Sequence, residues 1–181
     1  MRYSIEGHDS ARLALGTSSA KTFTLSFYVK GSITGNYSVA FANGSDNRVY
    51  ATTYNIASAN TWERKTITLT GDTSGTWATN NTEGMEIKWD LGSGSNFNVS
   101  SANQWLGEDK LKVSGTVNLV ATNAATLEFT GVQLEVDHTG SGVATDFEHR
   151  SYSQELQLCK RYFYKWNTEG ASYYMYSGAY T

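Results

Sequence analysis

The segment 22–30 most constrains the fold, because its apolar residues recur at every second position. Phe23, Leu25, Phe27 and Val29 alternate with threonine, serine and tyrosine residues. A period of two places successive side chains on opposite faces of a β-strand, whereas a helix would show a period near 3.6. The segment therefore predicts a strand that buries one face in a core.

Similar patterns recur along the chain at short intervals, with glycine, asparagine and aspartate between them. The predicted strands are residues 22–30, 37–42, 48–56, 64–69, 85–91, 116–120 and 126–136, and residues 2–7 read as a strand already under way. Segment 43–47 begins with Asn43 and Gly44 and predicts a tight hairpin turn, because Asn-Gly tolerates positive φ. This spacing is typical of an all-β sandwich or barrel, although the pattern leaves the strand order open.

Composition agrees with a chain of many strands. The 181 residues include 17 glycines, no proline and 13% aromatic residues, and the hydrophobic share is 39%. Many strands joined by Gly, Asn and Asp turns have this composition. The length suits one well-cored domain with an appendage.

The periodicity changes near the C-terminal end of the sequence. Residues 129–136 alternate like a strand, a glycine-rich linker follows, and residues 151–163 take helical spacing. One helix face carries four residues: Tyr152, Leu156, Cys159 and Phe163. With Ser151 and Ser153 as candidate caps, the pattern predicts a helix of about three turns. Cys159, the single cysteine, is expected to be a small buried hydrophobe on that face.

Several of these segments carry a family resemblance. GVQLEV at 131–136, the linker, and FEHRSYSQELQLCKRYFYKW at 147–166 resemble the end of a jelly-roll module of bacteriophage virion proteins, chiefly tail-fibre proteins. Segments 2–17, 21–41, 61–77 and 84–95 resemble earlier parts of the same module. Relatives usually have proline before Phe147 and after Arg150, where this chain has Asp146 and Ser151.

The resemblance implies an all-β fold, an antiparallel jelly-roll β-sandwich over residues 1–150. This expectation ranks above a generic immunoglobulin-like sandwich. Residues 151–181 would add one short helix and an aromatic β segment that links to, or starts, a further fibre domain. Both ends of the sequence are those expected of a piece of a longer fibre protein, the alternative being a short natural chain with a frayed tail.

The function implied by the resemblance is that of a non-enzymatic virion structural protein, a tail-fibre or capsid-surface fibre module, with host-surface glycan recognition as an added role. Such a module would lie on the phage particle, be assembled in the host cytoplasm, and contact other virion proteins as a homotrimer. The alternatives are a carbohydrate-binding module tethered to a cellular enzyme and a fragment of a phage depolymerase. The aromatic segment either packs on its own sandwich or forms the trimer contact, through Tyr162, Phe163, Tyr164, Trp166, Tyr173 and Tyr174.

Two tryptophans are the aromatic residues whose sequence context most suits a ligand. Trp77 and Trp105 stand among small polar residues, and amides that could bind sugar hydroxyls lie beside them: Asn80, Asn81, Asn103 and Gln104. An end plug of the sandwich or a subunit interface is favoured over sugar contact for this pair. Trp62 and Trp89 fall at or within strands and are predicted to pack in the core or on the sheet.

Catalytic and metal-binding patterns are weak in this sequence. His8, His138 and His149 have no ligand-like spacing, and no cofactor or metal is expected. The acidic residues are interpreted as scattered surface groups: Asp72, Glu83, Glu86, Asp90, Glu108 and Asp109. A net charge of −3 gives no basis for binding nucleic acid, and no apolar stretch predicts membrane insertion.

Overall fold

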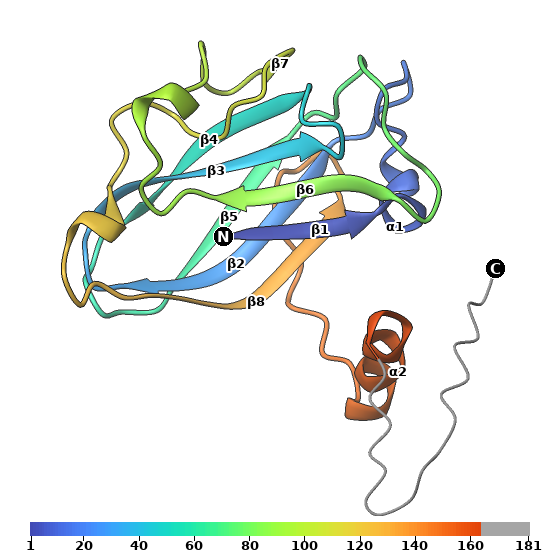
Figure 1. Cartoon of the computed structure of the whole chain (residues 1–181). Coiled ribbons are helices and arrows are strands. Elements are labelled where there is room, and N and C mark those ends of the chain that lie inside the picture. Colours follow the sequence, from blue (N-terminus) through green and yellow to red (C-terminus); the bar gives the residue numbers. More distant parts are fainter. Residues whose placement is uncertain (164–181) are drawn as a thin grey trace, which may run out of the picture. The chain divides into compact units, whose positions relative to one another are not determined.

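The computed structural model describes residues 1–163. The chain divides into two compact units, Met1–Phe147 and Glu148–Thr181. The first unit holds two antiparallel β-sheets, and helix α2 belongs to the second (Figure 1).

The strands of the first unit form a mostly-β architecture of two sheets. The larger sheet has the order β1 (Arg2–Glu6), β6 (Glu83–Trp89), β3 (Gly35–Asn43), β4 (Val49–Ile56) and β7 (Trp105–Leu106). The smaller sheet has the order β5 (Glu63–Leu69), β2 (Phe23–Gly31) and β8 (Leu127–Val136). The short helix α1 (Gly7–Ser10) follows β1. The prediction of an all-β chain with two antiparallel sheets is confirmed.

The core lies between the inward faces of the sheets. On β2 the side chains of Phe23, Leu25, Phe27 and Val29 are fully buried, as the alternation predicts. They pack in one cluster with residues of β3, β4 and β6, including Trp89. The buried face of β2 therefore joins the two sheets.

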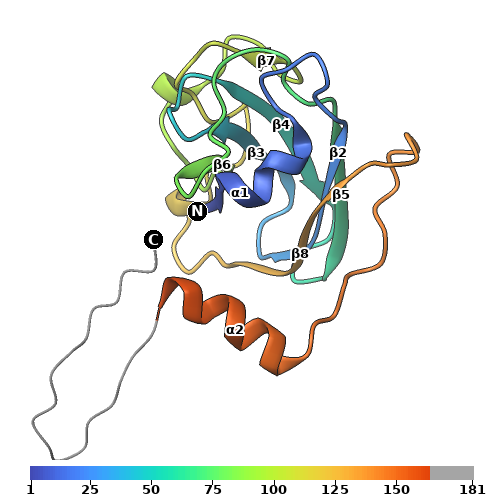
Figure 2. The ribbon, with the colours of Figure 1, turned by 90° about the vertical axis from the view of Figure 1, so that its right-hand side faces the viewer.

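The outer face of β2 is partly covered by the linker after β8, which we call the strap (residues 137–147). The Thr68 hydroxyl donates to the Gly142 carbonyl at 3.0 Å, and the Thr145 amide donates to the Glu135 carboxylate at 2.8 Å. Beneath it, Thr24 is buried and its hydroxyl bonds that of Thr68 at 2.8 Å. Figure 2 shows this segment, in orange, on the β5 and β8 side of the unit. The glycine-rich linker is thus a layer of the fold.

The larger sheet is also covered on its outer face, by the long segment between β6 and β8. Ala40, Val49 and Ala51 pack there with Val99 in a second, smaller apolar cluster. The Val113 amide donates to the Ser38 hydroxyl at 3.0 Å. Strand β3 is consequently covered on both faces and is buried from Tyr37 to Asn43.

The strand predicted at 116–120 does not form. Residues 119–121 make a single 3₁₀ turn, while the Val117 amide donates to Asn36 and the Val120 amide to Leu91. The alternation is real, because Val117 and Leu119 pack against the core. A strand also needs a ladder with one neighbour, and these amides bond two different segments.

The predicted hairpin at 43–47 joins β3 and β4, but for another reason than Asn-Gly flexibility. The positive φ lies at Asp46, at 53°. A Cβ on Gly44 would lie 2.2 Å from the Glu83 carbonyl oxygen, so glycine is required there by close approach of the chain.

The second unit contains α2 (Tyr152–Tyr162), which confirms the predicted helix. The Ser151 hydroxyl accepts from the Gln154 amide, and the Gln154 side chain accepts from the Ser151 amide, a capping box. The predicted burial of Cys159 is wrong, because Cys159 is exposed along with the rest of α2. Helical spacing tells which side chains share a face, but not what covers that face.

No helix within residues 1–163 combines the length and apolar character needed to cross a bilayer.

Candidate functional site

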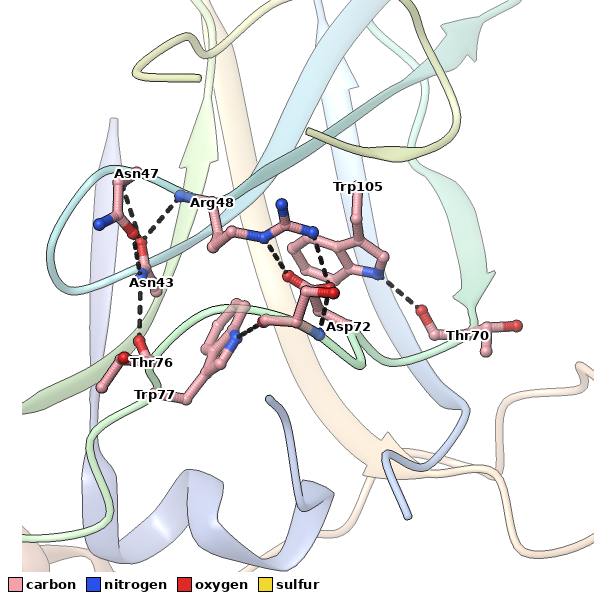
Figure 3. Close-up of polar contacts among 9 residues, drawn as sticks. Asn43, Asn47, Arg48, Thr70, Asp72, Thr76, Trp77 and Trp105 are labelled. Atoms are coloured by element: carbon pink, nitrogen blue, oxygen red, sulfur yellow. Dashed lines mark hydrogen bonds and ion pairs between the residues drawn. The ribbon is translucent and has the colours of Figure 1, made fainter. Parts of the chain in front are cut away.

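The structure brings the two ligand-like tryptophans together at one end of the sandwich (Figure 3). The Trp77 and Trp105 ring centroids lie 5.4 Å apart, edge to face at 88°. Trp105 belongs to β7, and its ring also tilts against Tyr50 of β4 at 5.4 Å. These distances are typical of favourable aromatic pairs.

Both indole N–H groups are used inside the fold. Trp77 donates to the Ser74 carbonyl at 3.1 Å, and Trp105 donates to the Thr70 carbonyl at 2.8 Å. Trp77 is 9% exposed, and Trp105 is half-buried. This geometry favours the end-plug alternative, while sugar contact at this pair stays a prediction.

An ion pair supports the same end of the sandwich. The Arg48 guanidinium donates to both Asp72 carboxylate oxygens, from Nε at 2.6 Å and Nη2 at 2.8 Å. Asp72 is 2% exposed and also accepts from the Ser74 amide at 3.0 Å. Hydrogen bonding to Asp72 raises the pKa of Arg48. The interpretation of Asp72 as a surface acid is therefore wrong.

Asn43 connects the hairpin to this end. Its buried side chain donates to the Thr76 carbonyl at 3.0 Å and to the Asn47 side chain at 2.7 Å. Its Oδ1 accepts from the Asn47 and Arg48 amides at 3.0 and 3.1 Å. The sequence carries no signal for this role, since it depends on contacts between separate segments.

Two further acids are buried in ion pairs. Glu86 lies 2.7 Å from an Arg2 nitrogen and 2.6 Å from the Lys88 ammonium, and burial raises the pKa of Glu86. Asp90 accepts from the Ser93 amide at 2.9 Å and lies 3.6 Å from the Lys112 ammonium. The surface interpretation of Glu86 and Asp90 is wrong, because these carboxylates are structural partners of nearby cations.

The predicted amide partners lie on different elements. The Asn80 carbonyl accepts from the His8 amide of α1, and its Oδ1 accepts from the Thr82 amide at 3.0 Å. Asn103 accepts from the Thr52 hydroxyl at 2.7 Å, beside β4. Asn81 and Gln104 are exposed. The four amide side chains therefore lie in two separate loops, residues 80–81 and 103–104.

The two tryptophans predicted to pack in the core or on the sheet differ from each other. Trp89 is 2% exposed and packs against Phe27 at 5.9 Å, which confirms that prediction. Trp62 is 45% exposed, so of its two predicted places, the core and the sheet surface, the core is excluded. It precedes β5 on the outer side of the smaller sheet, where the Lys30 ammonium lies 5.2 Å from its ring centroid.

A hollow of about 570 Å³ lies at the end of β6. Its lining includes Leu91, Leu111 and the exposed side chains of Phe97 and Val120, together with Asp109. The volume falls in the range of small-ligand sites. No pattern in the sequence indicated this hollow, since its lining comes from separate loops.

The predicted oligomer contacts can be located only in part. Tyr162 and Phe163 are exposed, at 68% and 73%. Tyr164, Trp166, Tyr173 and Tyr174 lie outside the described residues.

Glu63 anchors the loop that presents Trp62. Its carboxylate accepts from the Ala57 amide at 2.9 Å and the Ser58 amide at 2.7 Å, and it pairs with Lys65 at 2.5 Å. The Lys65 hydrogen bond is the main cause that lowers the pKa of Glu63, to about 2. The position of Glu63 at the start of a strand did not indicate that its carboxylate anchors this loop.

Glu63 is expected to make stability depend on pH in acid. Because its folded pKa of about 2 lies below the ordinary value of 4.5, its contribution is present above pH 4.5 and lost as pH falls toward 2. Urea unfolding over this range should show stability falling with pH, with a shallower slope for Glu63→Gln. Equal slopes for the two proteins would contradict this role.

Within residues 1–163, no three histidine, cysteine, aspartate or glutamate side chains group as a metal site. Comparison of the whole chain with family models, curated proteins and solved structures finds no match.

Proposed function

We propose that this chain is a non-enzymatic structural module of a bacteriophage tail-fibre or capsid-surface fibre, with the first unit a jelly roll. The strand, linker and capped helix from residue 131 onward resemble the end of such a module. The two antiparallel sheets agree with it at the level of architecture. The proposed location is the virion surface.

The path of the chain supports the jelly-roll part of the proposal. The chain leaves the smaller sheet after β2, returns to it at β5, leaves again for β6 and returns at β8. Repeated exchange between two antiparallel sheets is a feature of Greek-key sandwiches, to which jelly rolls belong.

The buried acids support a structural role over a depolymerase. Canonical glycosidases place two carboxyl groups across a substrate, about 5–9.5 Å apart. Here Asp72, Glu86 and Asp90 are buried in ion pairs with Arg48, Lys88 and Lys112. Carboxylates held in this way serve the fold.

The observation that carries the assembly proposal is the exposed apolar face of α2. Tyr152, Leu156 and Cys159 follow a 4-3 spacing, the seam pattern of helices that pack on one another, and Phe163, the extended residue that caps α2, follows four residues later. The exposed fractions are 82% for Tyr152, 37% for Leu156 and 73% for Phe163. Three copies of the chain would bury this face along a common axis.

Light scattering tests this assembly on the full chain. The expected mass is three times the chain mass of 19.9 kDa, and Leu156→Gln should lower it because a polar amide weakens an apolar seam. Leu158→Gln makes the same change on the opposite side of α2 and should keep the trimer. A wild-type monomer at micromolar concentration would contradict the proposal.

The second candidate is a carbohydrate-binding module tethered to a cellular enzyme. The specific observation in its favour is the exposed indole of Trp62 on a sheet face. A monomer that binds a defined glycan would favour this candidate over the fibre module.

A further inference from the structure

The outer face of the smaller sheet is divided into a covered half and an exposed half. Strap residues Gly142 and Thr145 bond the half that contains Thr68 and Glu135. The other half is formed by the opposite ends of β2, β5 and β8, where Tyr28 is 39% exposed. The Arg64 guanidinium donates to the Thr145 carbonyl of the strap, so the strap borders this half and leaves Tyr28 and Trp62 exposed.

Strand register arranges the exposed half in two rows. Tyr28 pairs with Arg64 on one side and Thr130 on the other. Lys30 pairs with Glu128, and Trp62, which directly precedes the last β5 pair of Glu63 with Val29, lies beside Lys30. We name this surface the outer platform, made of Tyr28, Lys30, Trp62, Arg64, Glu128 and Thr130.

The contacts of the outer platform hold its tryptophan in place. The Lys30 ammonium lies 5.2 Å from the Trp62 ring centroid and pairs with Glu128 at 2.9 Å. In the loop before Trp62, the Asn60 amide donates to the Gly31 carbonyl at 2.7 Å. With 45% of Trp62 exposed, the indole is oriented before any ligand arrives, which lowers the ordering cost of binding.

We propose that the outer platform binds a carbohydrate chain. A pyranose ring has an apolar C–H face and a rim of hydroxyls. Trp62 and Tyr28 supply two exposed rings from diagonal positions on neighbouring strands, positions whose backbones lie about 7–8 Å apart in a sheet. Around them, Lys30 and the other N–H groups of Arg64, whose Nη2 donates to the Thr145 carbonyl, would supply hydrogen-bond donors, and Glu128 would supply an acceptor.

The charges and size of the outer platform argue against other partners. Nucleic acid requires a clustered basic face, but here Lys30 is paired with Glu128 and the chain carries a net charge of −3. A stable protein interface needs about 800 Å² on each side, with an apolar centre depleted in charge. The outer platform instead carries the Lys30–Glu128 ion pair in the same row as Trp62.

The outer platform also fits a glycan better than the other aromatic surfaces do. At the Trp77 and Trp105 end, both indole N–H groups are bonded to backbone carbonyls. The hollow near Phe97 has a largely apolar lining. The inference rests on the proposed function for one point, the source of the glycan, because a fibre on a phage surface contacts bacterial polysaccharides.

Native affinity electrophoresis of the full chain tests this inference. The probes are a lipopolysaccharide O-polysaccharide, dextran, soluble starch and hydroxyethylcellulose, each cast in the gel. At least one of these polysaccharides should retard the wild type. Trp62→Ala or Tyr28→Ala should weaken the affinity derived from that retardation about tenfold or more. Trp62→Phe, which keeps a stacking ring, should retain part of it. The matched control is Phe97→Ala, since Phe97 is also 45% exposed.

Three outcomes would overturn carbohydrate binding at the outer platform. These are no retardation of the wild type by any probe, equal retardation of the wild type and Trp62→Ala, or reduced retardation in Phe97→Ala alone. Light scattering on the same samples separates the two proposals. A monomeric wild type that binds through Trp62 supports the outer platform and contradicts the fibre trimer, whereas a Trp62→Ala protein of reduced mass makes the surface a contact between copies.

Discussion

Replacing Arg48 with methionine is expected to lower the free energy of unfolding by about 3–5 kcal/mol. Arg48 makes two charge-assisted hydrogen bonds to Asp72, which is 2% exposed. Without the guanidinium, the carboxylate stays buried and keeps the hydrogen bond from the Ser74 amide. Urea unfolding at neutral pH and fixed protein concentration, followed by tryptophan fluorescence, measures this loss.

The matched control for this variant is Arg150→Met, which removes the same side chain from an exposed pair. Arg150 lies 3.6 Å from Glu155, and both side chains are about half exposed. Surface pairs of this kind contribute about 0–1 kcal/mol. Adding Asp72→Leu to Arg48→Met should restore part of the stability, because no buried charge is then left without a partner. Equal losses for the Arg48 and Arg150 variants would show that the Asp72 pair is not important for stability.

Replacing Phe27 with alanine is expected to cost about 3–5 kcal/mol of stability. Phe27 is fully buried, and its ring meets Tyr54 edge to face at 5.2 Å and Trp89 at 5.9 Å. Phe129 lies against the same ring at 5.7 Å. The substitution removes apolar contacts and leaves a cavity between the two sheets, where fixed strands limit relaxation.

Urea unfolding at fixed protein concentration measures the Phe27 loss as well. Phe97→Ala is the control, since Phe97 is 45% exposed and surface changes usually stay within about 0.5 kcal/mol. A loss below about 1 kcal/mol for Phe27→Ala would mean that the core collapses around the missing ring.

Much of the secondary structure followed from local pattern. The strand predicted at 22–30 is observed at Phe23–Gly31, and the strand predicted at 126–136 is observed at Leu127–Val136. The helix after Ser151 and its cap were also predicted. These features depend on side-chain periodicity and on a cap within one turn, which neighbouring residues determine.

The candidate site was less predictable, because burial depends on which segments meet. The end plug favoured for Trp77 did not indicate that this residue packs against Trp105, and Trp62, beside a strand, is exposed. The ion pair of Arg48 with Asp72 joins the start of β4 to the loop after β5. No local spacing in the sequence indicates these contacts.

The sequence by itself determined where most of the described strands and helix α2 lie, since alternation and capping act over a few residues. Only the tertiary structure decided the strand order, the place of Val117 outside any ladder, and the exposure of Cys159. It also decided that the strap covers one half of the smaller sheet and leaves the half with Trp62 open. These outcomes depend on long-range packing, which brings together residues that no local pattern relates.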